Sequence, residues 1–203
     1  MSDGRFTVLP DVRLSAVRGI VSNRMEEVAS ALAAGALEEF FTPTMRAALL
    51  ESFAQVGAHE GTVWLIDSTE RFLIPRFNNG PKSANFVGRF RQNLQSGMIG
   101  MVVATQQPIC ENRAHLNAVH DPSLDQELGL VTSAMIAVPF FFAHQLRGVI
   151  SAVQIRPANS DAPELPGFSP RDLRQLQLTA DVLERLIEHE LLTLSIGLGA
   201  AAC

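Results

Sequence analysis

Cysteine is scarce in this sequence, and its scarcity excludes several classes of protein. Only Cys110 and Cys203 occur among the 203 residues. Two cysteines cannot supply the disulfide framework of a small secreted protein or a four-cysteine zinc site. The N-terminal segment also lacks an apolar core of signal-peptide length. Together these features predict a protein of the reducing cytoplasm.

Long apolar runs and clusters of basic residues are also missing. No window approaches the roughly 20 apolar residues that a membrane-spanning helix needs. Acidic residues outnumber basic ones, 21 to 16, which gives a formal net charge of −5. A weakly acidic surface does not favour binding to nucleic-acid backbones or anionic membranes. We therefore expect neither nucleic acid nor a membrane as a main partner.

The common catalytic and metal-binding motifs are absent as well. The sequence contains no G-x-S-x-G, no P-loop and no G-x-G-x-x-G. It shows no pair of carboxylates with an evident base, and no histidine pair with metal-ligand spacing supported by carboxylates. The sequence therefore predicts neither catalytic residues nor a metal site, and we expect a protein that is not an enzyme.

What the sequence does contain is enough apolar material for a sizeable core. Hydrophobic residues make up 47% of the chain and charged residues 18%, which is typical of a folded globular domain. Helical spacing of apolar residues predicts a first helix over 12–38, within an N-terminal extension of residues 1–40. Thr42 as N-cap and Pro43 at the first helical position predict a second helix, which Gly57 ends.

The central part of the chain alternates between strand and helix patterns. The expected elements, in chain order, are a hairpin of strands 61–68 and 71–77, helices over 84–95 and 98–105, a strand over 108–112, and a hairpin of strands 133–142 and 147–155. Pro75 indicates an edge or a bulge in the second strand. The long polar segment 113–130 is typical of a lid over a binding site.

A closing helix begins at Pro170, with Ser169 as N-cap and Asp172 three residues after the cap. Its apolar residues form a heptad-like seam, made of Leu173, Leu176, Ala180, Leu183 and Ile187. Such a seam packs either on the protein's own sheet or, together with the N-terminal helix, against a second copy. We expect the main domain to span residues 41–192, followed by a tail at 193–203.

This order of elements predicts an α+β fold with a central antiparallel sheet and flanking N- and C-terminal helices. At the level of particular segments, the chain resembles the GAF domain family, small-molecule sensor modules related to PAS domains. The resemblance rests on four segments in order: GTVWLID, GMIGMVVATQQPICEN, SAMIAVPFFFAHQLRGVISAVQ and FSPRDLRQLQLTADVLERLIE.

The resemblance implies a stand-alone sensory or regulatory protein with a pocket between sheet and lid. The residues expected at this pocket are Phe86, Phe90, Met98, Val102, Cys110, Asn112, Asp121, Thr132 and Met135. Cys110 is expected to be a small apolar wall residue. Occupancy of the pocket would order the lid and bias the terminal helices, which would form a homodimer and act on a partner protein.

The ligand stays open at this point. A bilin would need a cysteine commonly followed by histidine, but Glu111 follows Cys110; haem would need an axial ligand from His115, His120 or His144, which read better as turn and lid residues. The cyclic-nucleotide pattern of the family is met only in part, by Asn112. Two other functions also stay open: a ligand-free dimerisation module, and a redox sensor or methionine sulfoxide reductase-like enzyme that uses Cys110.

Overall fold

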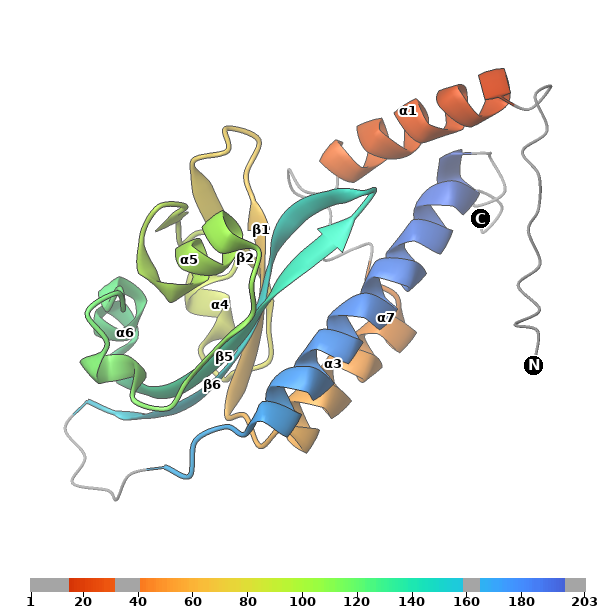
Figure 1. Cartoon of the computed structure of the whole chain (residues 1–203). Helices are drawn as coiled ribbons and strands as arrows, with labels where there is room; N and C mark the ends of the chain where they lie inside the picture. Colours follow the sequence, from red (N-terminus) through yellow and green to blue (C-terminus); the bar gives the residue numbers. More distant parts are fainter. Residues whose placement is uncertain (1–14, 32–40, 159–164, 196–203) are drawn as a thin grey trace.

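An antiparallel sheet stands at the centre of the computed structural model, which describes residues 15–31, 41–158 and 165–195 (Figure 1). Within that part of the chain the sheet has six strands in the order β3-β2-β1-β6-β5-β4. The strands are β1 (Glu60–Ile66), β2 (Phe72–Asn78), β3 (Gln92–Asn93), β4 (Ile109–Glu111), β5 (Leu130–Phe142) and β6 (Gln145–Pro157). The predicted α+β fold with an antiparallel sheet and flanking helices is confirmed.

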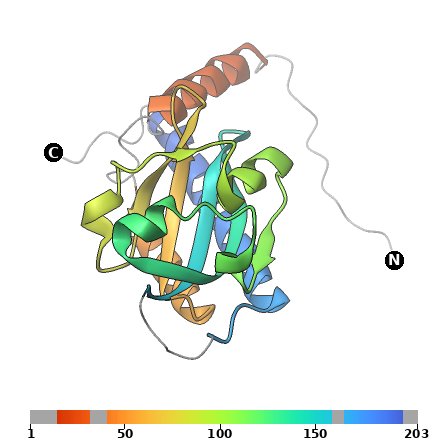
Figure 2. The ribbon, with the colours of Figure 1, turned by 90° about the vertical axis from the view of Figure 1, so that its left-hand side faces the viewer.

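Long helices cover one face of this sheet (Figure 1). They are α3 (Pro43–Gln55) and α7 (Pro170–Ser195), and α1 (Ser15–Ala31) lies beside the C-terminal part of α7. The opposite face carries the short elements α4 (Ser83–Phe86), α5 (Gly97–Thr105), η3 (Ala114–Leu116) and α6 (Ser123–Leu128). Figure 2 looks onto this second face. None of the described helices is long and apolar enough to cross a membrane.

The helix boundaries follow the capping residues that the sequence indicates. The Thr42 hydroxyl accepts a hydrogen bond from the Met45 amide at 3.3 Å, and Gly57 adopts φ +67° just beyond the end of α3. At α7 the Asp172 carboxylate accepts hydrogen bonds from both the amide and the hydroxyl of Ser169, each at 2.7 Å. Both caps therefore form as predicted.

The seam of α7 packs on the protein's own sheet. Leu176, Leu183 and Ile187 are fully buried, in one core cluster with Ile136, Phe140 and other residues of β5. This decides between the two interpretations of the seam. The first predicted helix, 12–38, is present over Ser15–Ala31; its remaining residues, and residues 196–203 of the tail with Cys203, lie outside the described part of the chain.

One predicted helix is wrong. Residues 84–95 do not form a helix: α4 is a single turn that ends at Phe86, and β3 follows at Gln92. Gly88 adopts φ +75° and donates its amide to the Pro75 carbonyl at 2.7 Å, which turns the chain away from the helical path. Phe86 and Phe90 are four residues apart, as they would be in a helix, but they lie in this turn. The predicted bulge near Pro75 is confirmed, because the β1–β2 register shifts between Val63 and Trp64.

The candidate ligand cavity

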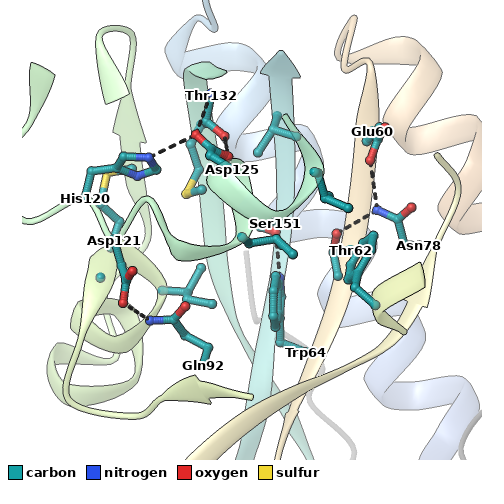
Figure 3. A pocket seen from close by; sticks show the side chains of 18 residues that line it. Glu60, Thr62, Trp64, Asn78, Gln92, His120, Asp121, Asp125, Thr132 and Ser151 are labelled. Carbon is teal, nitrogen blue, oxygen red and sulfur yellow. Dashed lines mark hydrogen bonds and ion pairs between the residues drawn. The ribbon is translucent and has the colours of Figure 1, made fainter. Parts of the chain in front are cut away.

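A cavity of about 80 Å³ lies between the sheet and the short elements that cover its second face (Figure 3). The sheet contributes Glu60, Thr62, Trp64, Asn78, Gln92, Thr132, Met135, Ser151 and Val153. The covering elements contribute Phe86, Gly97, Met98, Ile99, His120, Asp121, Leu124, Asp125 and Leu128. Residues 120–128, which include α6, cover the outer side of the cavity, and we call the segment 113–129 that contains them the lid.

Alternate residues of β1 form a polar floor at one end of the cavity. Glu60 and Thr62 lie two residues apart and therefore point to the same face of the sheet. The Asn78 side-chain amide, on the neighbouring strand β2, donates to the Thr62 hydroxyl at 2.9 Å and to the Glu60 carboxylate at 3.4 Å. Only 6% of Glu60 is exposed, and its burial raises the pKa of its carboxyl group, an effect that the hydrogen bond from Asn78 partly offsets.

Trp64 forms the next step of the same strand. Its indole Nε1 donates to the Ser151 hydroxyl on β6 at 2.9 Å, which fixes the position of the ring (Figure 3). Apolar side chains complete this part of the wall, among them Phe86, Met98 and Met135. The cavity therefore combines a polar end at Glu60 with an aromatic and aliphatic middle.

Asp121 fastens the lid to strand β3 and to the start of α5. One oxygen of its carboxylate accepts hydrogen bonds from Gln92 Nε2 at 2.9 Å and from Ser96 Oγ at 2.7 Å. The other oxygen accepts from the amide and hydroxyl of Ser123, within the lid. The Ser123 hydroxyl and the other donors favour the ionised form against the cost of burial, so they hold the pKa of Asp121 well below its usual range.

Asp125 makes a second fastening, to strand β5. Its carboxylate accepts hydrogen bonds from the Thr132 amide at 2.7 Å and from the Thr132 hydroxyl at 2.8 Å. His120 Nε2 lies 3.2 Å from the same carboxylate (Figure 3). The predicted lid segment is thus ordered by two carboxylates, one directed at Gln92 and Ser96 and the other at the start of β5.

Five of the nine residues that the sequence predicts at the pocket lie on the cavity wall: Phe86, Met98, Asp121, Thr132 and Met135. Phe90 and Val102 pack in the apolar cluster behind that wall, with Trp64 and Ile99. The rings of Trp64 and Phe90 meet edge to face, with their centroids 6.3 Å apart. Phe90 and Val102 therefore support the cavity without lining it.

Cys110 and Asn112 lie on the opposite face of the sheet, so their predicted place at the pocket is wrong. Cys110 pairs with Ile136, whose side chain belongs to the core under α7. Asn112 donates to the Phe168 carbonyl at 2.9 Å and accepts from the Phe168 amide at 2.7 Å, which fixes the approach to α7. Cys110 is also exposed instead of buried, with its Sγ 3.6 Å from the same Phe168 carbonyl.

Several polar wall residues were not predicted, namely Glu60, Thr62, Asn78, Gln92 and Ser151. A signal for two of them was present in the sequence. Glu60 and Thr62 alternate with apolar residues and precede Trp64 in β1, which pairs with a strand on each side. A polar side chain in such a central strand needs polar partners on its own face of the sheet.

The fold and the cavity together define a small α+β domain with a partly polar site between the sheet and a lid. The sequence matches the GAF domain family over residues 37–188, and the chain belongs to this family. A search of curated proteins finds no match.

Solved structures with the same fold come from several kinds of protein. The GAF domain of a phosphoenolpyruvate-protein phosphotransferase from Coxiella burnetii superposes with a TM-score of 0.59 at 18% identity, covering 92% of this chain and 99% of that one. The corresponding Acinetobacter domain gives 0.56 at 15%, covering 93% and 99%. Free methionine-R-sulfoxide reductase from Neisseria meningitidis gives 0.53 at 16%, covering 91% and 97%. At these identities the likeness concerns the fold alone.

Proposed function

We propose that this protein is a sensory or regulatory domain that binds a small molecule in the cavity under the lid. The observation that carries the proposal is the cavity between sheet and lid, with Glu60, Thr62 and Trp64 arranged along one strand toward it. A module that only holds other proteins together gains nothing from a cavity at this place, whereas a binding site needs a concave, mostly apolar space with a few polar groups. Its volume suits a small ligand and is far too small for haem or a bilin.

The cysteine-based alternative is not favoured. A redox sensor or a reductase acting on a ligand in this cavity would need its thiol to face that ligand. Cys110 points to the other face of the sheet, toward Phe168. Partial desolvation of the sulfur beside Phe168 and the neighbouring carboxylates of Glu111 and Asp172 also raise the pKa of the Cys110 thiol, which leaves less of the reactive thiolate.

Strand β5 offers a route from the cavity to the terminal helices. Thr132, which Asp125 holds, lies at the start of β5, and α7 packs along the opposite face of the same strand. At the far end of β5, just after the turn into β6, Arg147 of β6 forms an ion pair with Glu26 of α1. We infer that binding shifts the population of lid positions, that β5 transmits the shift to α1 and α7, and that these helices act on a partner protein.

The binding part of this proposal is tested by native mass spectrometry and hydrogen exchange. Purified protein is measured for retained small-molecule mass, and a library of small polar metabolites is then screened for compounds that raise the melting temperature. A binding compound should slow amide exchange in residues 113–129 and change it in α1 and α7. Failure of every compound to protect the lid would refute the sensor function.

The homodimer is proposed to form through the exposed side of the terminal helices. Leu178 and Val182 on α7 are 59% and 50% exposed, and Ile20 on α1 is 70% exposed. Because Leu183 is fully buried, Leu183→Glu should unfold the domain, whereas Val182→Glu should leave it folded and shift its elution on a sizing column toward the monomer. A folded Val182→Glu variant that elutes like the wild type would place the contact elsewhere.

A further inference from the structure

We propose that the cavity takes a small ligand with a positively charged ammonium group, which the Glu60 carboxylate binds. This inference rests on the proposed function and names the chemical class of its ligand. The first observation is the charge of the wall. Three carboxyl groups line it, those of Glu60, Asp121 and Asp125, and none of the lining residues in the described part of the chain is lysine or arginine.

Glu60 is the carboxyl group with binding capacity to spare. Asp121 and Asp125 each accept hydrogen bonds at both carboxylate oxygens, as described above. Glu60 accepts a single hydrogen bond of 3.4 Å at Oε2, from an Asn78 amide that makes a shorter bond to Thr62. No donor among the described residues reaches Oε1 of Glu60. A carboxylate can accept about four hydrogen bonds, so Glu60 retains most of its acceptor sites.

The position of this carboxyl group is both confined and largely removed from water. Glu60 is 6% exposed, and Gly80 packs so close that a Cβ atom there would lie 2.1 Å from the Glu60 carboxyl carbon. Lys82 acts on Glu60 only through space, because its Nζ donates to the Leu128 carbonyl. A buried carboxylate with a single long hydrogen bond is costly, and an ammonium group that binds it directly offsets that cost.

The rest of the cavity fits the other end of such a ligand. Trp64 and Phe86 supply aromatic surface, which attracts cations as well as apolar groups. Met98, Met135 and Val153 supply aliphatic surface. A volume of about 80 Å³ is well below the roughly 300 Å³ or more of pockets for drug-sized ligands. The geometry therefore points to a short-chain amine with an apolar body.

The test compares three probes of one carbon frame: n-butylammonium, n-butanol and butyrate. Their affinities for the full chain are measured by NMR titration at pH 7. The amine should bind at least roughly tenfold more tightly than the alcohol, since a hydrogen bond to a charged group contributes about 1.5–3 kcal/mol. Butyrate should bind more weakly than the alcohol, because the carboxylates of Glu60, Asp121 and Asp125 line the wall. Equal affinities for the amine and the alcohol would overturn the inference.

The variant Glu60→Gln keeps the size of the side chain and its capacity to accept from Asn78, but it removes the charge. It should lose roughly tenfold or more in affinity for the amine and change little toward the alcohol. The matched control is Glu51→Gln, at an exposed position of α3 on the other face of the sheet, which should leave amine binding within about twofold. Folding is checked by circular dichroism, and Glu60→Asp serves as a second variant, with the charge kept but withdrawn by one methylene.

The outcomes separate this inference from the function on which it rests. If the amine does not bind but other compounds of the library protect the lid, the ammonium assignment falls and the sensor function stands. If no compound of any charge occupies the cavity, both fall. If Glu60→Gln and Glu51→Gln weaken amine binding equally, the effect is general electrostatics and the assignment to Glu60 is wrong.

Discussion

The hydrogen bonds of Asp121 predict how firmly the lid is closed, and Asp121→Asn tests this. In the native protein one carboxylate oxygen of Asp121 accepts from Gln92 Nε2 on β3 and from Ser96 Oγ at the start of α5. Hydrogen bonds to a charged group contribute about 1.5–3 kcal/mol each in favourable cases. Asp121 is only partly buried, so solvent screening places each bond at the low end of that range or below.

An asparagine side chain keeps one acceptor oxygen but presents an amide to the second set of donors. We therefore expect Asp121→Asn to lower the free energy of lid opening by about 1–3 kcal/mol, which corresponds to roughly 5- to 150-fold faster exchange. Hydrogen exchange read by peptide should show this increase over residues 113–129 and no change in β1 or β6. The control is Asp181→Asn, at an exposed position of α7.

The same interaction fixes the sign of a pH effect. Because the hydrogen bonds lower the pKa of Asp121 in the folded protein, its contribution to lid closure is complete above the ordinary value of 3.8 and is lost as the pH falls below it. The wild-type lid should therefore loosen below about pH 3.8, and the lid of Asp121→Asn should not show this step. Equal exchange of the lid in the variant and the wild type at pH 7 would refute the reasoning.

Three further predictions concern stability and reactivity. Because burial raises the pKa of Glu60, Glu60→Gln should stabilise the protein at pH 7, and chemical denaturation should show this gain shrinking to nothing as the pH falls below about 4.5. Cys110 is exposed, so iodoacetamide should label it in the native protein, but more slowly than a free thiol at pH 8, and peptide mapping would detect this. Gly148→Ala should destabilise by about 2 kcal/mol or more, seen as a lower melting temperature, since its Cβ would lie within 3 Å of the Trp64 backbone.

The sequence predicts the elements of this fold well where capping residues and hydrophobic periodicity agree. Thr42 and Ser169 mark helix starts, and the alternation in 133–142 marks a strand, because each depends on neighbours in sequence. The failures concern information that is not local. The spacing of Phe86 and Phe90 is compatible with a helix, and only the hydrogen bond between Gly88 and Pro75 of another element shows that the chain turns there.

The misplacement of Cys110 has the same origin. In a strand of three residues, alternation says that Ile109 and Glu111 face one side and Cys110 the other, but not which side carries the cavity. That is decided by the register with β5, where Cys110 lies opposite Ile136. Since Met135 and Ile136 point to opposite faces, a shift of one residue would exchange the cavity wall with the helix-covered core. Without this register, the sequence predicts residues of both faces of the sheet at one pocket.

This alternation also bears on how a signal could pass through the molecule. Along β5, Thr132 and Met135 lie at the cavity, while Ala134 and Ile136 belong to the core that α7 covers. The register with β6 shifts between Thr132 and Ala134, at the point where Asp125 holds Thr132. Such an irregularity leaves the strand less constrained than regular pairing does. A ligand that moves the lid would therefore act on β5 at its least constrained point. The residues displaced there lie next to Ala134 and Ile136, which pack under α7.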